Sequence, residues 1–176
     1  MQAKQAIQNA ACCAEQNEKH AEQHKAVQNL HHAIKQWKQM MDENASTDAL
    51  DDILWQAMIA YQSKPFYTSS GLPFSYTVKR NKSGEYSGEL LVSRKEQSKT
   101  LTRSSVFFAF HKVLKQMQLE QPDHADDATV LLIPAMYRGP KAIGQIFGIS
   151  YVYSLFWNLG LIEAPEKVAA RMNNAT

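Results

Sequence analysis

The sequence predicts an α+β fold, in which helices pack on a small antiparallel sheet and a long helix projects from the N-terminal end. Three observations lead to this prediction. Residues 2–42 contain no Pro or Gly and are rich in Ala, Gln, Lys and Glu, which favours a single helix. Residues 74–93 alternate apolar and polar side chains on both sides of turn residues, as a β-hairpin does. Apolar residues at helical spacing occur before and after this hairpin.

The two halves of the predicted N-terminal helix differ in apolar content. Its first half has only alanine, cysteine and histidine on the stripe that would face the domain, which is little area for docking. We therefore expect residues 1–22 to project, to fray, or to pair with a second copy of the chain. The second half has an apolar seam at 3-4-3-4 spacing, made of Val27, Leu30, Ile34, Trp37 and Met41.

A second helix is predicted after the polar break at residues 44–47. Ser46 or Thr47 can cap it, and the aspartates that follow suit its positive end. Residues 63–73 are then predicted to be a loop, because two prolines and a glycine disfavour regular structure. The broad apolar face of the helix consists of Leu50, Ile53, Leu54, Ala57, Met58 and Tyr61.

The hairpin is predicted from Phe74, Tyr76 and Val78 on its first strand and from residues 89–93 on its second. Residues 129–133 are a candidate third strand, after an exposed acidic linker. Thr100 or Thr102 can cap a third helix between the hairpin and this linker. The apolar positions of that helix are Val106, Phe107, Phe110, Val113, Leu114 and Met117.

The chain is predicted to become helical again at Pro140, which suits a first helical turn. Two interpretations remain open: one buried helix to Leu159, or a turn at 148–150 between two short helices. The expected organisation is an N-terminal helical extension (1–45), a compact α+β domain (46–162) and a loose C-terminal tail (163–176).

The composition is that of an ordinary globular protein, with 44% hydrophobic and 20% charged residues. Cys12 and Cys13 are adjacent and have no other cysteine as a partner, which favours a reduced compartment. The N-terminus lacks the sustained apolar stretch of a secretory signal. Residues 142–162 include several polar side chains, which favours a buried helix over a membrane span. We therefore expect a cytoplasmic protein without membrane contact.

The positive charge is concentrated in the predicted hairpin and its flanks. Residues 76–103 hold seven Lys/Arg against three Asp/Glu, whereas residues 1–75 hold six against eight and residues 104–176 hold six against six. We expect antiparallel pairing to bring these cations together near the hairpin base, with aromatic residues nearby as stacking surfaces. The alternative is that they keep the sheet edges soluble. The cations are Lys79, Arg80, Lys82, Arg94, Lys95, Lys99 and Arg103.

Residues 144–162 resemble a helix-turn-helix motif, with a small residue, a turn glycine four positions on, a capping serine and a closing Leu-Gly-Leu-Ile. The resemblance implies a recognition helix whose outer face is Tyr151, Ser154 and Asn158. There are two departures from the motif. The interval between the turn glycine and the last glycine is short, and the helix has no Arg, Lys or Gln to read bases. A pair of core helices is the alternative.

The sequence points to no metal site and no cofactor. His20 and His24 are spaced to face one metal ion, but Cys13 and His31 lie seven residues away, about 10 Å along a helix. Cys13 has no base that the sequence fixes beside it. Gly139-Pro140-Lys141 at a helix start can hold one anion, although a capped helix explains it equally well.

No nucleotide-binding or hydrolase motif is present, so we do not expect an enzyme. The favoured function is a nucleic-acid-binding accessory or regulatory protein that uses the basic hairpin. The alternative is a protein–protein interaction module, in which the N-terminal helix forms a homodimer or docks on a partner and the basic patch meets an acidic surface.

Overall fold

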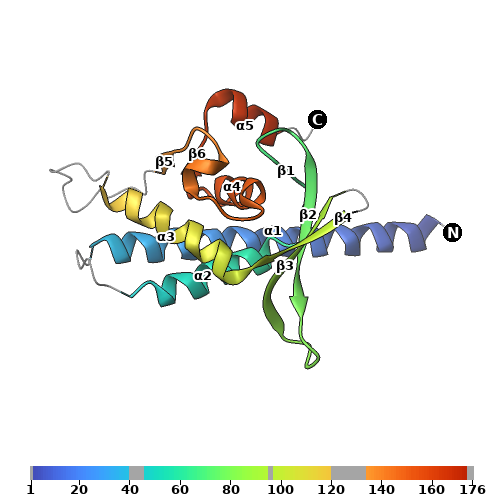
Figure 1. The fold of residues 1–176 in the computed structure, drawn as a ribbon. Helices are drawn as coiled ribbons and strands as arrows, with labels where there is room; N and C mark the ends of the chain where they lie inside the picture. Colours follow the sequence, from blue (N-terminus) through green and yellow to red (C-terminus); the bar gives the residue numbers. More distant parts are fainter. Residues whose placement is uncertain (1, 40–45, 95–96, 120–133, 174–176) are drawn as a thin grey trace.

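The computed structural model describes residues 2–39, 46–94, 97–119 and 134–173, except for the side chains of residues 2–15 and 97. The described residues form five α-helices, one 3-10 helix, a four-stranded antiparallel sheet and a separate pair of short strands. The predicted α+β class is therefore confirmed. Figure 1 shows the helices gathered beside the sheet, with the first helix running past it.

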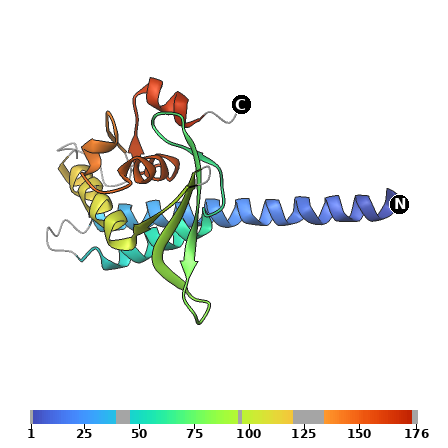
Figure 2. The same ribbon diagram turned by 45° about the vertical axis from the view of Figure 1, so that its right-hand side comes forward.

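The first helix, α1 (Gln2–Gln39), lies alongside α2 (Asp48–Ala60). Figure 2 shows its N-terminal part extending well beyond the other elements. In the predicted seam, Leu30 and Ile34 are fully buried, and Val27 and Trp37 are partly buried. Met41 lies outside the described residues. The seam is therefore confirmed where the structure describes it.

Helix α1 also contacts the far end of the chain. The His31 Nε2 atom donates a hydrogen bond to the Leu159 carbonyl, at 2.7 Å. A β-carbon at Gly160 would lie 3.0 Å from the His31 ring, so the next residue in the chain packs closely on the same side chain. The second half of α1 is therefore part of the core and not a separate arm.

Helix α2 begins just after the predicted polar break, with Thr47 at the N-cap, but the Thr47 side chain makes no capping bond to the helix. The Ser46 hydroxyl instead accepts from the N–H of Asp48, the first helical residue, at 3.2 Å. Four residues of its predicted apolar face are buried, and the other two, Ile53 and Tyr61, are partly buried. The buried four are Leu50, Leu54, Ala57 and Met58.

The sheet contains β1 (Phe66–Tyr67), β2 (Pro73–Arg80), β3 (Tyr86–Arg94) and β4 (Gln97–Thr102), and its strand order follows the chain. Alternation sends one set of side chains into the core and the other set away from it. The buried set is Phe66, Phe74, Tyr76, Val78, Leu90, Val92 and Leu101. The opposite face is mostly Ser and Thr.

Two strands lie where the sequence predicts none. Strand β1 falls in the predicted loop at 63–73, where Phe66 pairs with Phe74. Strand β4 falls in the predicted flank of the hairpin and pairs along β3. Its single buried apolar side chain, Leu101, is too little for an apolar alternation to be visible in the sequence. The candidate strand at 129–133 lies outside the described residues.

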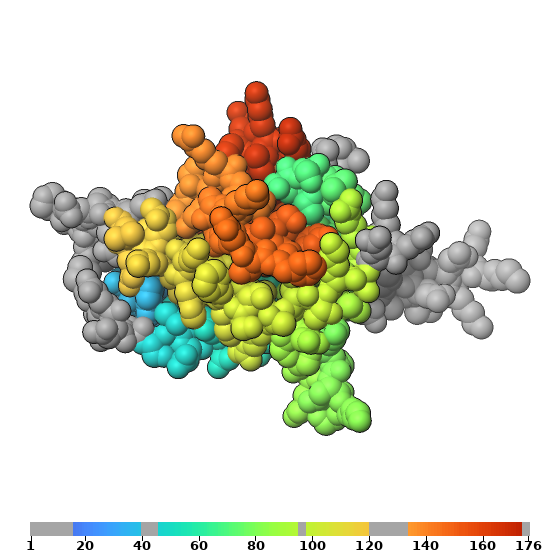
Figure 3. Space-filling model, in the orientation of Figure 1, coloured from blue at the N-terminus to red at the C-terminus, as the bar shows by residue number. Residues whose placement is uncertain are grey.

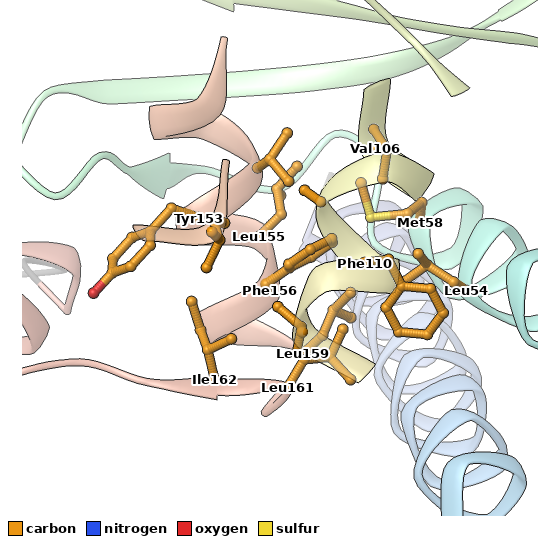
Figure 4. Close-up of a cluster of buried hydrophobic side chains, with 14 of the residues drawn as sticks. Leu54, Met58, Val106, Phe110, Tyr153, Leu155, Phe156, Leu159, Leu161 and Ile162 are labelled. Carbon is orange, nitrogen blue, oxygen red and sulfur yellow. The ribbon is translucent and has the colours of Figure 1, made fainter. Parts of the chain in front are cut away.

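The third helix, α3 (Arg103–Leu119), is capped as predicted, since the Ser105 N–H donates to the Thr102 hydroxyl at 3.3 Å. Its predicted apolar positions are buried, except for the partly buried Phe107. Figure 4 shows Phe110 of α3 among side chains of α2 and of the fourth helix. This cluster is the centre of the core.

The C-terminal part contains the 3-10 helix η1 (Pro140–Ile143), α4 (Ile149–Asn158) and α5 (Glu166–Met172). Two short strands, β5 (Ala135–Met136) and β6 (Ile162–Glu163), pair in parallel. Gly148 precedes α4 with a left-handed φ of 73°. The interpretation with a turn is therefore correct, and the single long helix is wrong.

The tail predicted to be loose from residue 163 onward is ordered as far as residue 173. Helix α5 places Met172 in the core at 4% exposure, with Val168 packed beside it. These two apolar residues, four positions apart, form a stripe that was too short to identify in the sequence. Among the helices that the structure describes, none has both the length and the apolar character needed to cross a membrane.

Candidate functional site

The basic residues of the hairpin do not gather at its base. Arg80 pairs with Tyr86 beside the turn, whereas Ser75 pairs with Ser93, the neighbour of Arg94, at the other end. The five positions from Arg80 to Ser75 span about 17 Å at about 3.3 Å per residue. The predicted cluster is wrong because antiparallel strands place the end of one strand beside the start of the other.

The cations near the turn are engaged with their own hairpin. The Lys79 ammonium lies 2.8 Å from Glu89 Oε2. The Arg80 guanidinium donates to the Gly84 carbonyl at 2.5 Å and lies 4.0 Å from the centre of the Tyr86 ring. Lys82 is exposed in the turn. These contacts fit the alternative in which the cations stabilise and solubilise the hairpin.

Arg103 joins the sheet to the helices. Its guanidinium pairs with Asp52 of α2 and lies over the rings of Trp55, at 5.4 Å, and Phe107, at 4.8 Å. Its side chain also packs against the backbone at Gly88, where a β-carbon would lie 3.4 Å away. Arg103 therefore has a structural role in this fold. Lys95 lies outside the described residues.

Lys99 and Arg94 are placed differently. Lys99 pairs across the strands with the buried Val92, so its side chain leaves the sheet on the side that the helices cover. Arg94 is two residues after Val92 and points to the same side. The Lys99 ammonium lies 5.3 Å from the centre of the Phe147 ring, in the loop before α4.

The outer face predicted for a recognition helix is wrong. Tyr151 is 6% exposed and Ser154 is fully buried, so neither can reach a base edge. The Ser154 hydroxyl donates to the Ser150 carbonyl at 3.1 Å. Asn158 is exposed, but its amide donates to the Ser154 carbonyl at 2.8 Å. Helix α4 is a core helix, as the alternative interpretation has it.

A different basic surface lies beside Lys99. Residues 97–119 and 134–162 contain no Asp or Glu, and α3 packs against η1 within these segments. Figure 3 shows the η1–α4 segment, in orange, against the yellow and yellow-green residues of α3 and β4. Apart from Arg103, every cation of the two segments is exposed; these are Lys99, Lys112, Lys115, Arg138 and Lys141.

Two phenylalanines are exposed on this surface. Phe108 of α3 is 50% exposed and Phe147 is 63% exposed. The Lys112 ammonium lies 5.0 Å from the centre of the Phe108 ring, and Lys115 continues the same helical stripe. We call this surface the aromatic–basic face and define it as Lys99, Phe108, Lys112, Lys115 and Phe147.

The loop at 144–148 holds the two phenylalanines on one surface. A β-carbon at Gly144 would lie 3.7 Å from the Phe108 ring, and one at Gly148 would lie 2.2 Å from Leu101 Cδ2. The loop is therefore packed against α3 at its start and against β4 at its end. Phe147 comes just before Gly148, so each ring lies at one end of this loop.

Sequence reasoning missed the aromatic–basic face because charges were counted over too long a window. All six acidic residues of 104–176 lie at 120–127 and 163–166, outside the acid-free segments. They cancel the six cations when charge is summed over the whole of 104–176, which hides the local excess of positive charge. A count by predicted element would have found the asymmetry. Phe108 was a second signal, because it falls outside the apolar positions of its helix.

Outside this face, His111 and Asp51 bring an imidazole and a carboxylate into contact. The His111 Nε2 atom lies 2.8 Å and 3.0 Å from the two Asp51 oxygens and 3.1 Å from the Thr47 hydroxyl. All three contacts use the same nitrogen, so His111 cannot pass a proton from Thr47 to Asp51 as a triad does. Burial raises the pKa of Asp51, and the hydrogen bond from His111 opposes that rise. The pair holds α3 to the start of α2.

A polar groove of about 900 Å³ lies between α1 and the connection from α2 to β1. Its lining includes Lys19, His20, Tyr61 and Lys64, and the pKa of Lys64 is lowered by burial. The Lys64 ammonium lies 4.7 Å from the centre of the Tyr61 ring. The described residues bring together no group of three metal-ligating side chains here or elsewhere.

Comparison with known proteins finds no match to this chain among family models, curated proteins or solved structures.

Proposed function

We propose that the protein binds nucleic acid through the aromatic–basic face, as an accessory or regulatory protein and not as an enzyme. The observation that supports this proposal is the pairing of two acid-free segments that expose five cations between them. A polyanion that approaches this side meets lysines from β4 and α3 without a neighbouring carboxylate from the same segments. Phosphate contacts supply most of the affinity of sequence-independent binding.

The small net charge of +2 does not oppose this proposal. At about 0.1 M salt, charges more than about 10 Å apart at a surface are largely screened from one another. A ligand on this face therefore responds mainly to the charges within about 10 Å of it. Local charge, and not the total, sets the attraction.

Fluorescence anisotropy of labelled oligonucleotides at two salt concentrations tests the proposal. If the three lysines of the face and one further exposed cation of the two segments, Arg138 or Lys141, touch phosphates, the slope of log K against log salt should be about −2.8 for a single strand and −3.6 for a duplex. Raising salt from about 50 to 200 mM, a change of about 0.6 log units, should then weaken binding roughly 50- to 150-fold.

A matched pair of variants locates the binding surface. Lys112→Gln with Lys115→Gln should flatten the slope by about 1.4 to 1.8 units, since two phosphate contacts are lost. Lys25→Gln with Lys167→Gln removes the same charge from exposed positions on α1 and α5 and should leave the slope unchanged. The proposal fails if nothing binds at about 50 mM salt, or if both double variants weaken binding equally.

A second candidate function rests on α1. The side chains of residues 16–22 are all exposed, and α1 extends beyond the domain in Figure 2. A helix of this kind gains stability when it pairs with another helix. We propose that this part of α1 joins two copies of the chain or docks on a partner protein, which is compatible with nucleic-acid binding on the other surface.

A further inference from the structure

The exposure of Phe108 and Phe147 needs an explanation that charge alone does not give. The two rings are 50% and 63% exposed, while most other apolar side chains of α3 and α4 are buried or partly buried against the core. The lysines at these rings make the surface too charged for the dry centre of a protein–protein interface, where Lys is depleted. Aromatic rings set among cations are the usual surface of proteins that bind single-stranded nucleic acid.

The placement of the rings suits one continuous strand. Gly144 is in contact with Phe108, and Phe147 is only three residues further along, which is at most about 11 Å of chain. Each ring has a lysine ammonium within about 5 Å of its centre, Lys112 at one and Lys99 at the other. A nucleotide that stacks on either ring therefore finds a cation for its phosphate at the same place.

A duplex cannot use these rings in the same way. Its base faces are covered by neighbouring bases, and opening one step for an aromatic side chain requires a few kcal/mol. The exposed stripe of α3 that holds Phe108, Lys112 and Lys115 also offers one amide, Gln118, for reading base edges in a groove, which is little for a helix that recognises a duplex.

We propose that the ligand of the aromatic–basic face is a single strand, with bases stacked on Phe108 and Phe147 and phosphates paired with Lys99 and Lys112. This inference rests on the proposed nucleic-acid binding and names its ligand class. Stacking is tolerant of sequence, so the protein should show little base preference.

The test compares a labelled 12-nucleotide oligothymidine with a 12-base-pair duplex at about 50 mM salt. The single strand should bind at least about tenfold more tightly. Phe108→Leu with Phe147→Leu keeps apolar side chains but removes both rings. It should weaken single-strand binding at least about tenfold, since each stacked base contributes about 1–3 kcal/mol. The salt slope should not change, because no cation is removed.

The outcomes separate the inference from the proposed function. If duplex and single strand bind equally and the leucine variant matches the wild type, the rings are not stacking platforms, although nucleic-acid binding stands. If neither oligonucleotide binds, the proposed function itself fails. Unfolding of the leucine variant is monitored by circular dichroism, and Phe108→Tyr with Phe147→Tyr, which retains the rings, should restore binding.

Discussion

Gly148 shows how one residue can fix the position of a surface patch, the aromatic–basic face. Its φ of 73° is unfavourable for any residue with a side chain, and a β-carbon there would lie 2.2 Å from Leu101 Cδ2. The backbone thus turns into α4 while touching β4, which is the contact that places Phe147 beside Lys99. The sequence indicates a turn at this glycine, but not which side chain it touches, because that contact spans 47 positions of the chain (148 − 101).

Gly148→Ala should lower the free energy of unfolding by more than a left-handed backbone alone explains. That backbone contributes about 1–2 kcal/mol, and displacing Leu101 should add about 1 kcal/mol or more. Gly84→Ala is the matched control, with a φ of 86° and no atom within 4 Å of its β-carbon. Urea unfolding of both variants measures the difference. Equal losses would mean that Leu101 moves aside freely.

Asp51 provides a pH-dependent contribution to stability. Burial raises the pKa of this carboxyl above 3.8, although His111 lowers it. The folded state therefore holds the proton more tightly than the unfolded state, and this contribution to stability falls as pH rises from 3.8 through the folded pKa. The carboxylate is tolerated at neutral pH because His111 donates to both of its oxygens.

Asp51→Asn should remove this dependence, because an amide does not ionise. Between about pH 3.5 and pH 6, the free energy of unfolding of the variant should rise relative to that of the wild type. Other carboxylates also ionise in this range, but they affect both proteins alike. Urea titrations at the two pH values give this difference. If the wild type instead gains stability relative to the variant over this pH range, the bond to His111 outweighs burial in setting the pKa of Asp51.

At the scale of elements, predictability followed the number of buried side chains in each element. Helices α2 and α3 and strand β2 bury three or more residues in a regular period, and all three are predicted. Strand β3 buries only Leu90 and Val92, but the turn residues before it identify it as the partner of β2. Strand β4 buries Leu101 alone among its described side chains, and α5 has only Val168 and Met172 on the core. Tertiary pairing and not local pattern forms these last two elements, so the sequence does not reveal them.

Helix α1 divides into two parts with different roles. The first deeply buried side chain among those described is Gln23, whose amide donates to the Ala60 carbonyl at 3.0 Å. Leu30 and Ile34 follow in the core. We therefore expect residues 16–22, whose side chains are exposed, to contribute little to the stability of the domain.

Deletion of residues 1–22 should leave the domain folded, with an unfolding midpoint close to that of the full chain. Sedimentation should show a dimer for the full chain and a monomer for the truncated one. Loss of the folding transition on truncation would place these residues in the core. A monomer for both chains would leave docking on a different protein as the role of the exposed part of α1.

At the scale of the whole molecule, the fold sorts its charges by surface. The sequence located an excess of cations between residues 76 and 103, but the structure divides them between the turn, the contact of Arg103 with Asp52 and the far end of the sheet. Among those that the structure describes, Lys99 alone lies over the ring of an exposed phenylalanine, Phe147. No pattern along the chain could show this, because Phe147 meets Lys99 only through tertiary packing.

The bond between His31 and the Leu159 carbonyl also sets the order of events during synthesis. It joins residues 128 positions apart, so it cannot form until nearly the whole chain has left the ribosome. At about 5–20 residues per second, that interval is on the order of ten seconds. Helices α1 and α2 are close in sequence and can pair early, but Leu30 and Ile34 remain without their C-terminal neighbours until then. A nascent chain that stalls before α4 would expose this seam to chaperones and to other unfolded chains.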